Sequence, residues 1–173
     1  DLTTNVTRSE IFSDLNPYTG PGAPAPVIKT SVVGNALNPR QVEIKLNGTQ
    51  VSLSDLNFFD YARIQASVTI PQISSGSATI DIKNICPLPN DRMAIAKTEL
   101  VYARQFNFGG ADNFTFELPA NPAGNYLEIS NFNFGGVNPV LYDITNGKRY
   151  VCDFVTTPAP LVKVALLPSA TAR

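Results

Sequence analysis

Strict alternation of apolar and polar residues constrains the fold of this chain more than any other feature. In YARIQASVTI, residues 61–70, every second residue is apolar, and the residues between them are polar apart from the first, a tyrosine. Two more runs show the same period of two, with apolar positions Val42, Ile44 and Leu46 in one and Ala78, Ile80 and Ile82 in the other. Such a strand has one buried and one solvated face, which predicts an antiparallel β-sandwich.

The turn residues support the same interpretation. Asn47-Gly48 and Asn146-Gly147 each lie between strand-like runs. Asn-Gly favours the type I′ hairpin turn, in which both central residues have positive φ. Fourteen prolines and eleven glycines interrupt the chain at short intervals, so no long helix is expected.

Two segments are predicted to lie outside the strands. Residues 1–26 are rich in Thr, Asn, Pro and Gly, and we expect an extended, loop-like entry there. SLSDLNFFDY, residues 52–61, is too short to hold a helix by itself. We favour a loop in which Phe58 and Phe59 plug one end of the sandwich.

The strand candidates fall into two sets separated by FNFGGADN. A long run, MAIAKTELVYARQF, ends the first set, and NFTFELP, NYLEISNF, PVLYDIT, RYVCDF and LVKVALLP follow. We therefore predict an all-β chain: an extended segment over 1–26, a jelly-roll-like sandwich over 27–106 and a second small β subdomain over 107–173. One continuous sandwich remains an alternative.

The pentapeptide FNFGG occurs twice, at 106–110 and 132–136. Its two phenylalanines are two residues apart and share one face of a strand, and Gly-Gly then lets the chain turn. We expect Phe106 and Phe132 to be structural core residues. An aromatic platform for sugars and an internal duplication are weaker alternatives.

Composition excludes several classes of function. A net charge of -1 argues against nucleic-acid binding. The chain has no histidine, which most nucleophilic catalysis and many metal sites require. Cys86 and Cys152 lack metal-ligand spacing, so they are either buried thiols or one disulfide. No apolar run is long enough to cross a bilayer. Because the chain starts at Asp1 and ends at SATAR, we expect a piece of a larger protein.

Acidic residues near turns leave a structural calcium ion open. The candidate ligands are Asp55, Asp60, Asp91, Asp112 and Asp143. They form no DxDxDG-type run, so each is expected to be a turn former or a surface group. Asp91-Arg92 is interpreted as a structural ion pair at a sheet end. We predict no catalytic, cofactor-binding or metal-binding residue.

Three motifs resemble a known family. They are the Asp-Arg…Glu-Leu-x-Tyr-x-Arg strand from Asp91 to Arg104, which contains Tyr102; the Phe-x-Phe-x-Leu-Pro run at 114–119 with Tyr-Leu-Glu-Ile at 126–129; and VLYDITNGKR at 140–149. They are similar to the region before the catalytic domain in gingipain-type cysteine peptidases of Bacteroidetes, a group that includes the sortase of type IX secretion. The resemblance covers about the C-terminal half of the chain, and its motifs are structural.

The resemblance implies an exported parent with a Cys-His peptidase domain after residue 173. The expected role is that of a noncatalytic accessory region, secreted or at the cell surface, which braces or positions that domain and contacts other surface or secretion components. The alternative is a carbohydrate-binding jelly roll in a multidomain surface protein. Tyr61, Tyr102 and Tyr126 on one solvated face would favour it, and burial of Tyr102 and Tyr126 would oppose it.

LVKVALLP suggests where such a domain docks. Val162, Val164 and Leu166 alternate with a second face that is also apolar, apart from Lys163. A strand that is apolar on both faces requires cover on both sides. We therefore expect Leu161, Ala165 and Leu167 to form part of an interface with the downstream domain.

Overall fold

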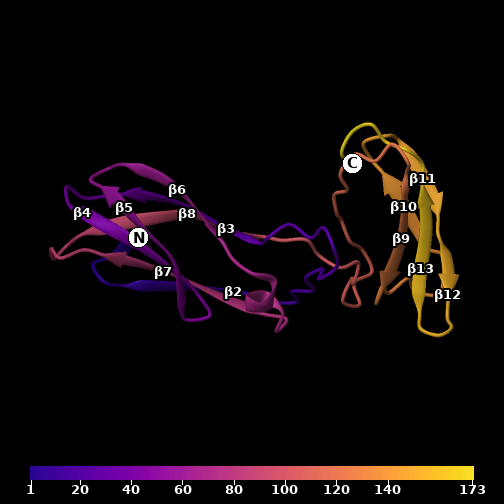
Figure 1. The fold of residues 1–173 in the computed structure, drawn as a ribbon, viewed down its shortest axis with the longest axis horizontal. Coiled ribbons are helices and arrows are strands. Elements are labelled where there is room, and N and C mark those ends of the chain that lie inside the picture. Colours follow the sequence, from indigo (N-terminus) through magenta and orange to yellow (C-terminus); the bar gives the residue numbers. More distant parts are fainter. The chain divides into compact units, whose positions relative to one another are not determined.

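The computed structural model describes residues 1–173 and divides them into two compact units, residues 1–105 and residues 106–173. The first unit contains eight strands and one short 3₁₀ helix (Figure 1). In chain order they are β1 (Leu2–Thr3), β2 (Thr7–Phe12), β3 (Val27–Gly34), β4 (Pro39–Leu46), β5 (Thr49–Asn57), β6 (Tyr61–Ser67), η1 (Ile70–Ile73), β7 (Ala78–Ile85) and β8 (Arg92–Val101). No helix in the chain is long and apolar enough to span a membrane.

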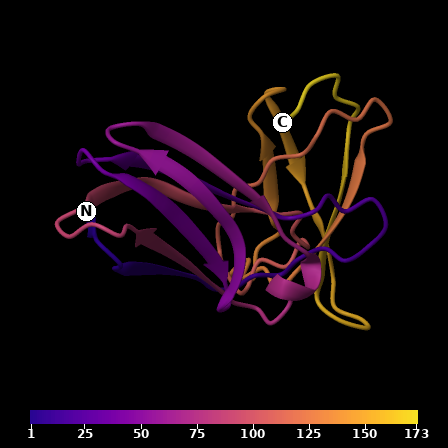
Figure 2. The ribbon, with the colours of Figure 1, turned by 60° about the vertical axis from the view of Figure 1, so that its left-hand side comes forward.

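The first unit is a jelly roll. Its two four-stranded sheets have the orders β1-β8-β3-β6 and β2-β7-β4-β5, and all neighbouring strands are antiparallel. The chain passes from one sheet to the other at every connection except that between β4 and β5, and eight strands arranged in this way make a double-sheet jelly roll. Figures 1 and 2 show these strands from two directions. The predicted fold class, including the jelly-roll-like sandwich, is confirmed.

The alternating runs form the inner faces of this sandwich. The apolar positions of β4 and β7 are buried, as is most of the apolar face of 61–70, in one cluster that includes Ile28, Ile44, Ile64, Ile80 and Ile82. Ile70 lies in η1, because the chain leaves the sheet after Ser67. The Asn47-Gly48 turn between β4 and β5 has φ of 49° and 81°, as a type I′ turn requires.

The N-terminal 26 residues are not all loop, contrary to the prediction. Residues 7–12 form β2, which pairs with β7 from Thr7↔Lys83 to Phe12↔Ala78, and residues 2–3 form β1, which pairs with the start of β8. β2 is an edge strand whose side chains are mostly exposed, so it carries no apolar alternation. Main-chain pairing alone makes it a strand, and TRSEIF gave no signal of that.

The predicted plug is also wrong. Residues 49–57 form β5, which pairs with β4 along its whole length. Phe58 and Phe59 lie beyond the end of this strand, and their side chains are exposed. Phe58 has φ of 53° in the turn that leads to β6. The turn therefore directs both rings into solvent and not over the end of the core.

A buried ion pair holds one end of the jelly roll together. Asp91 accepts hydrogen bonds from Arg40 Nε at 2.7 Å and Arg40 Nη2 at 2.8 Å, and both side chains are fully shielded from solvent. Asn84 and Asn38 donate to the same carboxylate. Burial by itself would raise the pKa of Asp91, but these hydrogen bonds outweigh it and hold the pKa below its ordinary value. Asp91 thus pairs with Arg40, and the expected Asp91–Arg92 pair does not form.

The second unit contains five strands in two small sheets (Figure 1). They are β9 (Asn125–Ser130), β10 (Val140–Asp143), β11 (Lys148–Val151), β12 (Asp153–Val155) and β13 (Leu161–Leu166). One sheet has the order β12-β13-β9, and β10 pairs with β11 in the other. RYVCDF is divided between β11 and β12 at Cys152. NFTFELP, predicted as a strand, joins neither sheet.

The hairpin between β10 and β11 differs from the predicted type I′ turn. Its loop has four residues, 144–147, and only Gly147 has positive φ, at 60°. The Asp143 carboxylate accepts hydrogen bonds from both the backbone and the side-chain amide of Asn146. Asn146 is thereby held by the residue three positions earlier, and Gly147 alone supplies the left-handed conformation.

Candidate functional site

The predicted interface residues lie on β13, the central strand of the sheet β12-β13-β9. Val162, Val164 and Leu166 are buried on the inner face. On the opposite face, which we call the outer face, Leu161 is half-buried, Ala165 is exposed and the Leu167 side chain just past the strand is 57% exposed. The strand therefore has one covered and one uncovered apolar side.

The outer face also carries charge. Lys163 lies opposite Glu128 of β9, with Nζ and Oε1 3.0 Å apart, and the hydrogen bond to Glu128 is the main cause of the raised pKa of Lys163. Tyr126 lies opposite Ala165 and is exposed. This surface is therefore amphipathic: apolar side chains flank a partly exposed ion pair, the composition that is typical of interfaces between domains of one chain.

The two FNFGG copies form the same local turn. Gly109 and Gly110 have φ of 61° and 85°, and Gly135 and Gly136 have 62° and 82°. In each copy the asparagine side chain accepts a hydrogen bond from the first glycine N–H, Asn107 in one and Asn133 in the other. The repeated sequence thus encodes a repeated turn, although the flanking segments differ.

Each copy also contacts a residue adjacent to the other copy. Gly110 N–H donates to Asn131 O at 2.6 Å, and Asn133 N–H donates to Ala111 O at 2.9 Å. The segment that begins at Phe106 therefore runs beside the end of β9, with a parallel bridge between Asn107 and Ser130. Neighbouring segments of one unit share the same turn, which accounts for the repeat on structural grounds.

Phenylalanine rings from the two FNFGG copies and from the segment after the first copy pack in the core of the second unit. Phe108 is the central ring: it is buried, stacks on Phe114 with centroids 4.1 Å apart, and contacts Phe106, Phe116 and Phe132. Phe106 and Phe132 are only partly buried against this cluster. Their structural role stays a prediction, and it is Phe108 that lies deepest.

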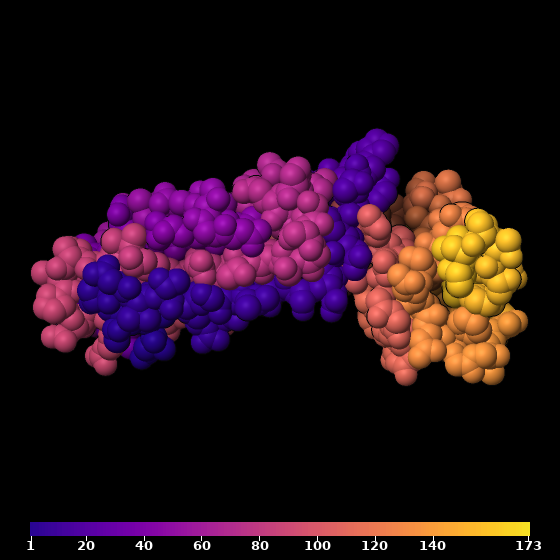
Figure 3. Space-filling view, turned by 90° about the horizontal axis from the view of Figure 1, so that it is seen from below, coloured from indigo at the N-terminus to yellow at the C-terminus, as the bar shows by residue number.

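The rings border a groove with a volume of about 690 Å³, here called the aromatic groove. One wall is the segment 112–118 and the other is β10 with the residues on either side of it. Leu141, Ile129 and Arg173 also line it. The last residues of the chain, yellow in Figure 3, lie at the surface of this unit. Most of its lining side chains are apolar, and sequence patterns alone gave no indication of this groove.

Arg173 forms a polar cluster within the lining of this groove. Its Nη1 donates to Asp143 Oδ2 at 3.3 Å and its Nη2 donates to Asn125 Oδ1 at 2.6 Å. Burial by itself would raise the pKa of Asp143, but hydrogen bonds from Asn146 and Arg173 outweigh it, and the pKa lies below its ordinary value. Arg173 Nε is buried without a hydrogen-bond partner.

The tyrosines of the carbohydrate-binding alternative are divided between the two units. Tyr61 is exposed on β6 of the first unit and Tyr126 is exposed on β9 of the second. Tyr102, which the sequence marked as structural, packs partly buried against the jelly-roll core. Neither unit by itself presents the three rings as a platform.

Both cysteines are free and buried. Cys86 Sγ lies 3.4 Å from Pro39 O in the first unit. Burial raises the pKa of the Cys152 thiol in the second unit. No cluster of three or more Cys, Asp or Glu residues is placed to hold a metal ion. Two of the candidate calcium ligands, Asp91 and Asp143, pair instead with Arg40 and Arg173.

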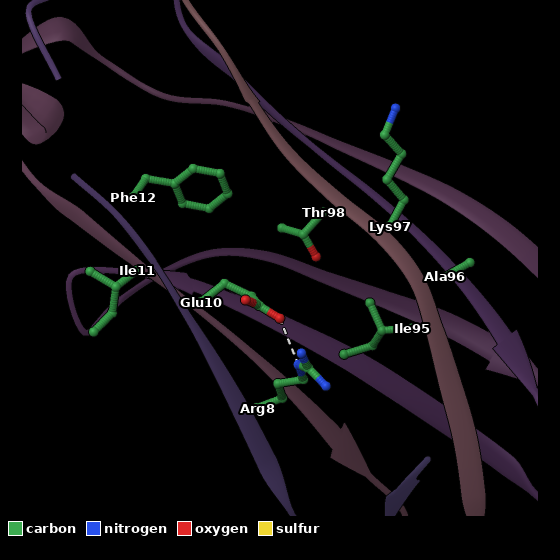
Figure 4. Close-up of a pocket in the computed structure, with 8 residues that line it drawn as sticks. All are labelled: Arg8, Glu10, Ile11, Phe12, Ile95, Ala96, Lys97 and Thr98. Carbon is green, nitrogen blue, oxygen red and sulfur yellow. Dashed lines mark hydrogen bonds and ion pairs between the residues drawn. The ribbon is translucent and has the colours of Figure 1, made fainter. Parts of the chain in front are cut away.

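A smaller cleft of about 340 Å³ lies between β2 and β8 of the jelly roll (Figure 4). Its lining is mixed. Phe12, Ile95 and Thr98 face the opening, and Arg8 is paired with Glu10 across 2.6 Å. Charged side chains along exposed edge strands discourage further strand pairing, so this cleft is a weak candidate for a binding site.

No protein-family model matches the chain, and no curated protein matches it in sequence. In structure the chain is similar to dimeric latent PorU from Porphyromonas gingivalis, with a TM-score of 0.67 and 11% sequence identity. The likeness covers 98% of this chain and 17% of that chain, so the present chain spans about one sixth of the solved protein. At this identity the likeness shows the fold: the chain has the all-β architecture of a segment of PorU.

Proposed function

We propose that this chain is a noncatalytic accessory β region of a secreted or surface gingipain-like cysteine peptidase, in which it braces or positions the catalytic domain. The observation that carries the proposal is the structural likeness to PorU, which extends over 98% of the chain but only 17% of PorU. The sequence motifs between Asp91 and Arg149 support the same family. Export, an outer-surface location and contacts with other surface or secretion components belong to this proposal.

The cysteine environments support a noncatalytic role. A nucleophilic cysteine needs a lowered pKa and access to substrate. Cys152 has a raised pKa and Cys86 is almost fully buried. Neither thiol therefore has the properties of a peptidase nucleophile, and the catalysis of the parent is assigned to its peptidase domain.

We assign the docking of that domain to the outer face of β13. Ala165 and Leu167 are exposed there, and Leu161 is half-buried. Covering these side chains with another domain would remove apolar surface from water. The Lys163–Glu128 pair lies between them and can form polar contacts that fix the orientation of the docked domain.

The experiment uses the longer parent protein with Leu167→Asp. A carboxylate that is buried in an apolar contact loses its hydration and gains no partner, so docking should weaken. We expect faster cleavage between the two domains in limited proteolysis, with the unfolding midpoint of this chain unchanged. Leu37→Asp is the matched control, because Leu37 is also an exposed leucine, at 75% against 57% for Leu167, but lies in the first unit. Equal cleavage rates in both variants would contradict docking on the outer face.

The carbohydrate-binding alternative has less support. Tyr102 is partly buried against the core, and the exposed Tyr61 and Tyr126 belong to different units. Each exposed ring also has a neighbouring cation, Arg63 beside Tyr61 and Lys163 beside Tyr126. Glycan-array binding that is lost in Tyr126→Ala would favour this function over the accessory role.

A further inference from the structure

The segment 113–118 has the burial pattern of a strand but lacks most of the pairing of one. Phe114, Phe116 and Leu118 are turned inward, whereas Asn113, Thr115 and Glu117 are exposed. This is the period of two of a β-strand. Neither sheet of the second unit includes the segment, so its side chains are packed as in a sheet while its main chain is not.

One residue of the segment does form a ladder contact, and its partner is Arg173. Leu118 N–H donates to Arg173 O at 2.6 Å, and Arg173 N–H donates to Leu118 O at 2.9 Å. Asn121 and Ser169 exchange hydrogen bonds in the same way, at 2.9 and 3.0 Å. Reciprocal pairs of this kind define an antiparallel ladder, so the chain approaching Arg173 runs antiparallel to the segment around Leu118.

The next position on that edge has no partner. In an antiparallel ladder, residues two apart direct their N–H and C=O groups to the same edge. Phe116 therefore points to the edge at which Leu118 meets Arg173, and no backbone hydrogen bond joins Thr115, Phe116 or Glu117 to another residue. Arg173 is the last residue of the 173-residue sequence, so the edge of Thr115 to Glu117 has no partner among residues 1–173.

The aromatic groove lies along this same segment. Phe116 and Leu118 form part of one wall, and β10 lies on the other side. β10 pairs only with β11, so its second edge is also unpaired. Tyr142 and Ile144 on this side are 67% and 87% exposed. An apolar recess between two unpaired main-chain edges fits an extended polypeptide better than a compact apolar ligand, because a polypeptide satisfies the main-chain groups as well.

We propose that the aromatic groove is the acceptor site for a β-strand. The strand runs antiparallel to 113–117, continues the ladder begun by Arg173 and pairs its second residue beyond Arg173 with Phe116. The occupant is the polypeptide that links Arg173 to the catalytic domain of the parent, and this identification rests on the proposed function. Side chains on its groove-facing positions are apolar, in contact with the phenylalanine cluster. The linker thereby becomes part of the second unit, and its pairing fixes the point at which the following domain begins.

The experiment appends a defined strand to the complete 173-residue chain. The probe is a ten-residue tail of alternating threonine and valine fused after Arg173, and amide hydrogen exchange is followed by NMR. We expect the Phe116 amide to exchange at least tenfold more slowly than in the chain without a tail. The Thr115 amide faces the opposite edge and should change little. The matched control tail has proline at each valine position. Proline removes one hydrogen bond of every reciprocal pair and disfavours a strand within a sheet, so the tail should not pair and Phe116 should stay unprotected.

Two results would overturn the proposal. One is equal exchange at Phe116 with both tails; the other is protection that appears only when the chain self-associates, since that would show pairing between copies. Neither result would contradict the proposed docking on the outer face of β13, because the Leu167→Asp experiment tests that face and not the aromatic groove. Conversely, loss of docking there would not alter the exchange of Phe116.

Discussion

Arg40 and Asp91 are fully buried and joined by two hydrogen bonds, of 2.7 and 2.8 Å, although 51 residues separate them. Arg40 belongs to β4 in one sheet, and Asp91 immediately precedes β8 in the other. The guanidinium also donates to the carbonyls of Phe58 and Ala36. A single side chain thus connects both sheets and two loops at one end of the jelly roll.

Removing one partner of this pair should destabilise the first unit strongly. Asp91→Ala leaves the guanidinium buried without a counter-ion, and breaking a buried pair in this way costs about 3–5 kcal/mol. We expect a matching fall in the free energy of unfolding measured in urea. The double variant Arg40→Met, Asp91→Leu should lose less than Asp91→Ala, because it leaves no unpaired charge. A double variant as unstable as the single one would show that the pair contributes through geometry that apolar residues cannot replace.

The Asp143 carboxylate predicts acid sensitivity. Hydrogen bonds from Asn146 and Arg173 hold its pKa below the ordinary value in the folded state. A lowered folded-state pKa contributes stability above the unfolded-state pKa of about 3.9, and this contribution is lost as the pH falls below it. The free energy of unfolding of the second unit should therefore decline between about pH 5 and pH 2. Asp143→Asn should flatten that decline, and an identical pH profile in the variant would contradict the assignment.

The two FNFGG copies should differ in their contribution to stability. Phe108 is buried among four rings, so Phe108→Ala should cost about 3–5 kcal/mol. Phe134 occupies the same position of the second copy but is only half-buried and contacts Phe154. We expect Phe134→Ala to cost roughly half as much, since a half-exposed ring loses less transfer free energy. Equal losses in thermal unfolding would show that the cluster extends to Phe134.

Both thiols should be unreactive in the folded chain. Cys86 and Cys152 are each about 2% exposed, and burial raises the pKa of Cys152. An aromatic disulfide reagent at pH 8 should label neither in native conditions and both in 6 M guanidinium chloride. Cys86→Ala and Cys152→Ala identify which thiol reacts. Rapid native labelling accompanied by peptide cleavage would overturn the noncatalytic interpretation of this chain.

Local sequence predicted the elements whose burial alternates along the strand. Val42, Ile44 and Leu46 face the core because successive side chains of a strand point to opposite sides. A strand with one buried face therefore has an apolar residue at every second position of its sequence. Asn47-Gly48 is equally local, since only its own φ values decide the turn. Alternation on β13 likewise located the outer face that we propose as an interface.

Main-chain pairing and long-range ion pairs were decided by the tertiary structure. β2 is a strand because β7 lies beside it, whereas Phe114 to Leu118 have strand-like alternation and too few partners to form one. Asp91 pairs with Arg40 and not with its neighbour Arg92, because the Arg40 side chain is buried beside it whereas Arg92 is exposed. Hydrogen bonds between residues far apart in sequence produce no periodic pattern along the chain. The sequence by itself therefore determined which strand faces are buried, and the tertiary structure determined which strand edges are paired.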